Sequence, residues 1–237
     1  MKYNRIMFSG PSGIGKTTLA EFVSSLPGGP EFISGSMSKL MDNTKNILHK
    51  DIISQDKKDL YQQDYQLINL RNKLFHNKLE FVTDRSYLDS AAYFIYKQDT
   101  SIPQCEIEHF VNLCKLLLND HCDCLIFLNI HPKWANEWTV EDNNKRICNV
   151  FFQAHISAVM RMALDMMGYR STKSTYDYRS KVDDIPKFLK GIIRNIVELD
   201  YGFEEGVISS TKGKTNVYII NEPNRNIRED ILRLILT

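Results

Sequence analysis

Hydrophobic positions along the chain fall into short apolar runs separated by longer polar or amphipathic segments. Runs at residues 6–8, 79–83, 124–130 and 216–220 are typical of buried parallel strands. A further short strand is expected at residues 31–34. The run at 124–130 is nearly continuous, as a central strand of a parallel sheet requires.

The segments between these runs carry apolar residues at helical spacing. They predict one helix directly after residue 17 and further helices at 56–77, 88–97, 106–119, 145–167, 184–199 and 227–236. Strands that alternate with helices predict a three-layer α/β fold, in which helices flank a central parallel sheet.

Composition indicates an ordinary globular chain. With 237 residues, 43% hydrophobic and 25% charged, residues 1–237 are most simply one domain. The net charge of +1 supplies no overall basic field for nucleic acid. The start of the chain leads almost directly into the first strand, and no apolar run approaches the roughly 20 residues of a membrane span. Five scattered cysteines suggest reduced thiols, so we expect a cytoplasmic protein that does not enter a membrane.

Residues 10–17 match G-x-x-x-x-G-K-[ST], the P-loop pattern, between a predicted strand and a predicted helix. Its glycines let backbone N–H groups approach phosphate oxygens at a helix N-terminus, where the helix dipole also favours an anion. Lys16 can reach the β- and γ-phosphates, and the Thr17 hydroxyl is placed to bind Mg²⁺. The motif therefore predicts ATP or GTP binding with Mg²⁺. The predicted nucleotide-binding residues are Gly10, Pro11, Ser12, Gly13, Ile14, Gly15, Lys16, Thr17 and Thr18.

Asp84 and Arg85 follow directly after a predicted strand. Ligands of open parallel sheets bind beyond the carboxyl ends of the strands. Asp84 is thus placed to join Thr17 at the metal or to take a proton from an acceptor hydroxyl, and Arg85 suits a bidentate grip on a phosphate. The alternative is a surface ion pair at a strand-to-helix turn, with Asp84 or Ser86 as the helix cap.

Residues 81–86 read Phe-Val-Thr-Asp-Arg-Ser, with Asp89 and Tyr93 on the helix that follows. This resembles the strand-end motif of small P-loop kinases, since thymidylate kinases carry a similar Asp-Arg-Tyr and deoxynucleoside kinases a Glu-Arg-Ser. Phage kinases that phosphorylate 5-hydroxymethyluracil in DNA fit the same sketch. The resemblance implies a nucleoside- or nucleotide-kinase-like fold. It also implies a metal or base role for Asp84 and a phosphate contact for Arg85.

The resemblance also implies a lid, at about residues 131–148, and the chain departs from it in a long insertion before the last strand, at about 169–215. Arg146 is the expected lid arginine and would stabilise charge on the γ-phosphoryl group. An exposed arginine paired with Asp142 is the competing interpretation. Basic and aromatic residues interleave at the start of the insertion, which suits either contact with nucleic acid or a solvated loop.

Three classes of nucleotide-binding protein compete. A GTPase needs Asn-Lys-x-Asp after a late strand, but the nearest match, at residues 77–80, precedes the wrong strand. A motor ATPase needs an Asp-Glu pair after a strong strand, but residue 129 is Asn. We therefore predict a kinase that moves the ATP γ-phosphoryl group to a nucleoside, a nucleotide or a modified base, with DNA and a homodimer left open and a regulatory ATPase as the alternative. Its predicted catalytic residues are Lys16, Asp84, Arg85 and Arg146.

Overall fold

The computed structural model describes residues 1–36, 40, 57–97, 102–130, 150–170, 196–201, 215–221 and 224–237. Its strands are β1 (Arg5–Ser9), β2 (Phe81–Thr83), β3 (Cys124–Leu128), β4 (Tyr169–Arg170), β5 (Ile196–Tyr201) and β6 (Asn216–Ile220). Its helices are α1 (Lys16–Ser25), α4 (Lys57–Phe75), α5 (Tyr87–Lys97), α6 (Gln104–His121), α7 (Val150–Met166) and α9 (Arg225–Leu236).

The strands form one sheet in the order β2-β1-β3-β6-β5-β4. The first four are parallel, and the register places Met7 opposite Thr83 and Ser9 opposite Phe127. β5 and β4 then extend the sheet in antiparallel fashion. The predicted parallel sheet is confirmed for β2, β1, β3 and β6. The predicted insertion, where it is described, adds antiparallel strands to the sheet.

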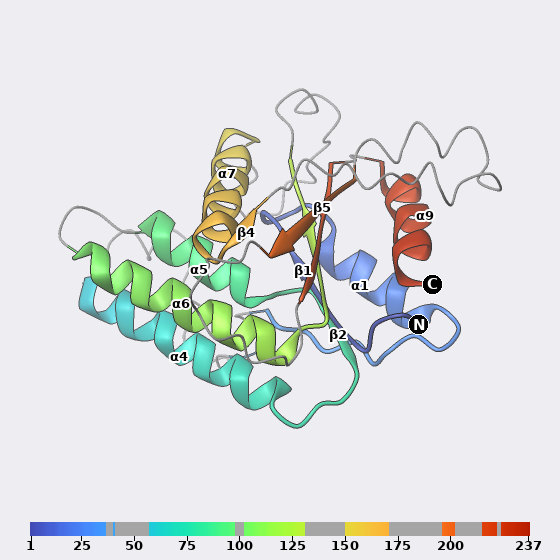
Figure 1. Cartoon of the computed structure of the whole chain (residues 1–237), viewed down its shortest axis with the longest axis horizontal. Coiled ribbons are helices and arrows are strands. Elements are labelled where there is room, and N and C mark those ends of the chain that lie inside the picture. The colour runs from blue at the N-terminus through green and yellow to red at the C-terminus, as the bar shows by residue number, and fades with distance from the viewer. Residues whose placement is uncertain are drawn as a thin grey trace.

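Helices cover both faces of this sheet (Figure 1), with α1 and α9 on one face and α4, α5, α6 and α7 on the other. Alternation along the strands explains the two layers. Ile6 and Phe8 of β1 belong to the core beneath α1 and α9, whereas Met7 belongs to the core beneath the other helices. The chain ends meet on the first face, where the amide of Lys2 donates to the carbonyl of Leu236 at 2.8 Å.

Three sequence predictions need correction. The strand expected at 31–34 is a single parallel bridge between Phe32 and Val82. The strand expected at 79–83 begins only at Phe81. The helix expected at 184–199 is wrong at its end, because Ile196 begins a strand that pairs with β6. A short run of Ile, Val, Glu and Leu satisfies a helical and an extended pattern equally, and the free edge of β6 decides between them.

None of the helices in the described part of the chain has the length and hydropathy of a membrane-spanning segment.

Candidate active site

The predicted phosphate-binding loop forms the turn between β1 and α1. Gly15 caps α1 with φ 88°, a left-handed conformation that residues with a Cβ rarely adopt. Beyond its chain neighbours, no atom lies within 4 Å of where its Cβ would be, so the strain of the backbone and not a lack of space favours glycine there. Gly10 is needed for close packing, because a Cβ there would lie 2.7 Å from the carbonyl oxygen of Leu128 on β3.

Lys16 begins α1, and its side chain turns back over the loop. Its Nζ donates to the carbonyl oxygens of Gly10 at 2.5 Å and Pro11 at 2.6 Å. Only 5% of the residue is exposed. A positive charge therefore lies at the N-terminus of α1, where free backbone donors and the helix dipole also attract an anion.

The structure brings the two predicted metal ligands together. Thr17 Oγ1 donates to Asp84 Oδ2 at 2.7 Å, and the Gly35 amide donates to Asp84 Oδ1 at 3.0 Å. The two side chains meet because β1 and β2 are adjacent parallel strands, whose carboxyl ends share one edge of the sheet. Asp84 is buried, and no ion pair reaches it within the described part of the chain.

This donor set fits Mg²⁺. A hydroxyl and a carboxylate are hard oxygen donors, and Mg²⁺ usually takes one or two carboxylates together with phosphate oxygens and water. Across the described residues, no group of three or more His, Cys, Asp and Glu side chains could hold an ion by itself. Thr17 and Asp84 are therefore suited to a magnesium ion that is shared with the phosphates of a nucleotide.

Arg85 is held by Asp89, one helical turn further along the chain. Its NH1 lies 3.0 Å from Asp89 Oδ1, and 23% of the Arg85 side chain is exposed. Asp89 Oδ2 accepts from Ser9 Oγ at 2.6 Å and from the Ser86 amide at 3.0 Å. The carboxylate thus ties the end of β1 to the start of α5.

Asp89 is a buried anion. Burial acts to raise the pKa of Asp89, but the charges of Arg85, Lys16 and Arg71 and the hydrogen bond from Ser9 outweigh it, so that its pKa lies below the ordinary value. Asp89 is therefore ionised at neutral pH and serves as the counterion of this cluster of cations.

Arg71 of α4 is a site residue that the sequence analysis missed. It is 3% exposed, and its guanidinium donates to the Gly35 carbonyl at 3.3 and 3.4 Å, to the Ser86 carbonyl at 3.1 Å and to Ser90 Oγ. Burial lowers the pKa of Arg71, although the charge of Asp89 opposes this. A signal was present, since Arg71 lies on the stripe of α4 that buries Ile68 and Phe75.

Two further side chains missed by the sequence analysis contact the loop from distant helices. Gln153 Nε2 of α7 donates to the Ser12 carbonyl at 2.7 Å. Arg228 NH1 of α9 donates to the Ile14 carbonyl at 2.7 Å. Both side chains are 2% exposed. On the other side of the loop, the residue that follows β3 is Asn129, which is an amide and not a carboxylate. Asn129 bonds to Asn221 and Ser157.

The remaining predicted residues are placed only in part. Thr18 follows Thr17 in the first turn of α1 and is half-buried. Arg146 and the predicted lid lie outside the described residues, as does much of the predicted insertion.

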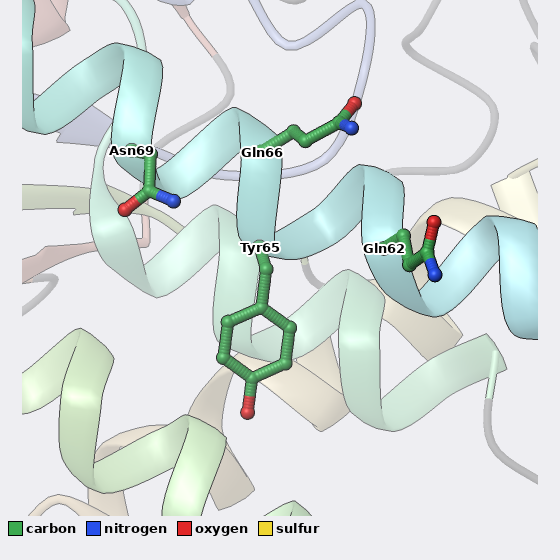
Figure 2. Close-up of a pocket in the computed structure, with 4 residues that line it drawn as sticks. All are labelled: Gln62, Tyr65, Gln66 and Asn69. Atoms are coloured by element: carbon green, nitrogen blue, oxygen red, sulfur yellow. The ribbon is translucent and has the colours of Figure 1, made fainter.

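A surface recess on α4 lies apart from this chemistry (Figure 2). It is lined by Gln62, Tyr65, Gln66 and Asn69. None of the four contacts the loop or Asp84 through a hydrogen bond, and the Tyr65 ring packs edge-on against Phe110 of α6, with ring centroids 5.0 Å apart. The recess therefore belongs to the outer face of the helical layer.

Comparisons with known proteins bear on the fold and on the family. A comparison with curated proteins finds no match. The structure is similar to that of deoxyadenosine kinase from M. mycoides with bound dCTP, with a TM-score of 0.53, 13% identity, and coverage of 98% of this chain and 97% of that one. The same kinase with bound dATP gives a TM-score of 0.52 at 13% identity, covering 98% and 99%.

A family model described as "AAA domain" matches residues 5–178. The match spans the loop, Asp84 and Arg85, and the structural likeness confirms the predicted α/β fold. The chain therefore belongs to the AAA domain family, and its fold is the P-loop kinase fold of deoxyadenosine kinase.

Proposed function

We propose that this protein is an ATP-dependent phosphotransferase that moves the γ-phosphoryl group to a nucleoside or nucleotide. The contact between Thr17 Oγ1 and Asp84 Oδ2, 2.7 Å long at the mouth of the loop, carries the proposal. It joins the end of the phosphate-binding loop to an acidic strand end, where a metal-bound phosphate and an acceptor would meet.

The chain's own residues divide the work by position. The amides of the loop bind the phosphates, and Lys16 exchanges its contacts with the Gly10 and Pro11 carbonyls for phosphate oxygens. Thr17 and Asp84 hold the magnesium ion, which supplies neutralisation of phosphate charge when it is bound. Arg85, fixed by Asp89, is directed to the acceptor or the transferring phosphate. Arg146 remains the proposed lid arginine.

The acceptor is proposed on two grounds. The structural neighbours are described as a deoxyadenosine kinase with dCTP and dATP bound, which favours a deoxynucleoside-type acceptor. The Arg85 side chain, which is 23% exposed and follows Asp84 directly, supplies a cation suited to an anionic substrate. A base within DNA, as in phage kinases for 5-hydroxymethyluracil, is the second candidate because a long, partly basic insertion precedes β6.

Because the matching family model is described as an AAA domain, a regulatory ATPase is the competing proposal to the kinase. Such an enzyme would hydrolyse ATP without passing phosphate to another molecule. The position of the acid favours the kinase, since the carboxylate lies after β2 while β3 is followed by Asn129. An acid after β2 can contact both Thr17 and a hydroxyl acceptor above the sheet edge.

A labelled-phosphate screen tests the proposal. The purified protein is incubated with γ-labelled ATP, Mg²⁺ and, in separate reactions, deoxynucleosides, nucleoside monophosphates and DNA containing 5-hydroxymethyluracil. Label should pass to one acceptor class, and Lys16→Ala should abolish the transfer while the protein stays folded. Lys78→Ala is the matched control, because Lys78 forms an exposed ion pair with Glu31 on the surface. Release of free phosphate without any labelled acceptor would establish the ATPase instead.

A further inference from the structure

Each peptide of the phosphate-binding loop has two polar ends that a phosphate treats in opposite ways. The N–H group attracts an anion and the carbonyl oxygen repels it. Because the peptide unit is planar and trans, these two groups point in opposite directions. Whatever holds a loop carbonyl from outside therefore turns the next amide toward the inside.

Two buried side chains hold such carbonyls from outside the loop. Gln153 Nε2 donates to the Ser12 carbonyl at 2.7 Å, so the amide of Gly13 points away from α7. Arg228 NH1 donates to the Ile14 carbonyl at 2.7 Å, so the amide of Gly15 points away from α9. Lys16 already holds the carbonyls of residues 10 and 11.

We infer that Gln153 and Arg228 are positioning residues that fix the amides of Gly13 and Gly15 for phosphate binding. This inference rests on the proposed use of the loop for ATP. A loop with three glycines at positive φ is free to turn its peptides the other way, so orientation has to come from elsewhere in the fold. The two anchors come from helices on opposite faces of the sheet.

The hydrogen-bond inventory of Gln153 supports a role beyond packing. Its Nε2 is bonded, but its buried Oε1 has no hydrogen-bond partner among the described residues. A side chain chosen for stability alone would avoid an unpaired buried acceptor. Gln153 instead keeps a side-chain amide whose Nε2 donates to the loop, and this atom orients the backbone amide of Gly13. Arg228 adds charge, because a buried guanidinium makes a stronger hydrogen bond than a neutral donor.

The test measures binding of Mg·ATP and of inorganic tripolyphosphate in the absence of any acceptor, together with the thermal stability of the ligand-free protein. Gln153→Met keeps the length of the side chain without a donor, and it also removes the unpaired Oε1. We expect about tenfold weaker binding of both ligands, the value of one hydrogen bond, with little change in the ligand-free melting temperature. Gln153→Glu, which cannot donate when ionised, should bind both ligands more weakly still.

For α9, Arg228→Met should weaken both ligands by about tenfold to a hundredfold, the range for a charged hydrogen bond, and Arg228→Lys should restore part of the loss. Arg161→Met on α7 and Arg225→Met on α9 are exposed controls that should bind as the wild type does. Folded Gln153→Met and Arg228→Met proteins that bind tripolyphosphate as tightly as the wild type would overturn the inference and leave the proposed function standing. A wild type that binds neither ligand would overturn both.

Discussion

Asp84 and Asp89 are two buried carboxylates, five residues apart, in opposite surroundings. Asp84 accepts hydrogen bonds from the Thr17 hydroxyl and the Gly35 amide, and no ion pair reaches it in the part of the chain that is described. Asp89 is paired with Arg85, bonded to Ser9, and close enough to Lys16 and Arg71 for their charges to lower its pKa.

This difference predicts different roles for the two acids. A carboxylate whose charge is already balanced by guanidinium groups gains little from a metal ion, whereas one held by neutral donors can still offer its full charge. In the proposed mechanism, Asp84 is the acid available for chemistry, and Asp89 is the acid that keeps the cations in place. Exchanging each carboxylate for its amide should therefore produce two different defects.

The largest effect is expected for Asp84→Asn. The amide oxygen can still accept from Gly35 and the amide nitrogen can donate to the Thr17 hydroxyl, so the fold should be retained, but the charge toward a metal-bound phosphate is lost. We expect the rate of ATP-dependent phosphoryl transfer to fall by about 10³-fold, comparable to removing a key electrostatic group from an active site. The melting temperature should change little. A variant that keeps the wild-type rate would remove Asp84 from the mechanism.

Asp89→Asn should show the reverse signature. Removing one charge from a buried pair leaves Arg85 and Arg71 without their counterion, which costs about 3 kcal/mol of unfolding free energy. Urea unfolding measures this loss, with Asp165→Asn, an exposed carboxylate on α7, as the control. If Asp89→Asn were as stable as the control while losing activity, the contrast between the two acids would be wrong.

The geometry of the candidate site was predictable from the sequence where the information is local. The loop is a contiguous motif whose glycines specify its backbone, and the meeting of Thr17 with Asp84 follows from two strand ends in a parallel sheet. Which of the two acids lies among cations and which among neutral donors was not predictable. The positions of Arg71 and Lys16 around Asp89 depend on how α4 and α1 pack.

The anchors of the loop were also beyond sequence reasoning. Gln153 lies 141 residues from the carbonyl that it binds, and Arg228 lies 214 residues from its own. No periodic pattern couples positions at such separations, so only the packed fold reveals them. The same limit explains β5, whose residues 196–199 fit a helix until the edge of β6 is available as a pairing partner.

Arg71 connects the surroundings of Asp84 with those of Asp89. It donates to the Gly35 carbonyl on the Asp84 side and to the Ser86 carbonyl on the Asp89 side. Arg71→Met leaves these carbonyls without their donor, at a cost of about 2 kcal/mol in unfolding free energy. The transfer rate of the folded protein should also fall, since Gly35 positions Asp84. Lys73→Met, exposed on the same helix, is the control. A stability loss with an unchanged rate would show that Arg71 supports only the fold.

The smallest effect is the acid dependence of stability. The pKa of Asp89 is lower in the folded protein than its ordinary value of about 4. A lowered folded pKa means that the unfolded chain binds the proton first, so the stabilisation is fully present above about pH 4 and is lost as the pH falls through the folded pKa. Each such group contributes a slope of at most about 1.4 kcal/mol per pH unit. Urea unfolding of the wild type and Asp89→Asn between neutral and acidic pH should therefore show curves that converge as the pH drops below 4. Curves that stay parallel would show that Asp89 keeps its ordinary pKa and that its cations do not act as its partners.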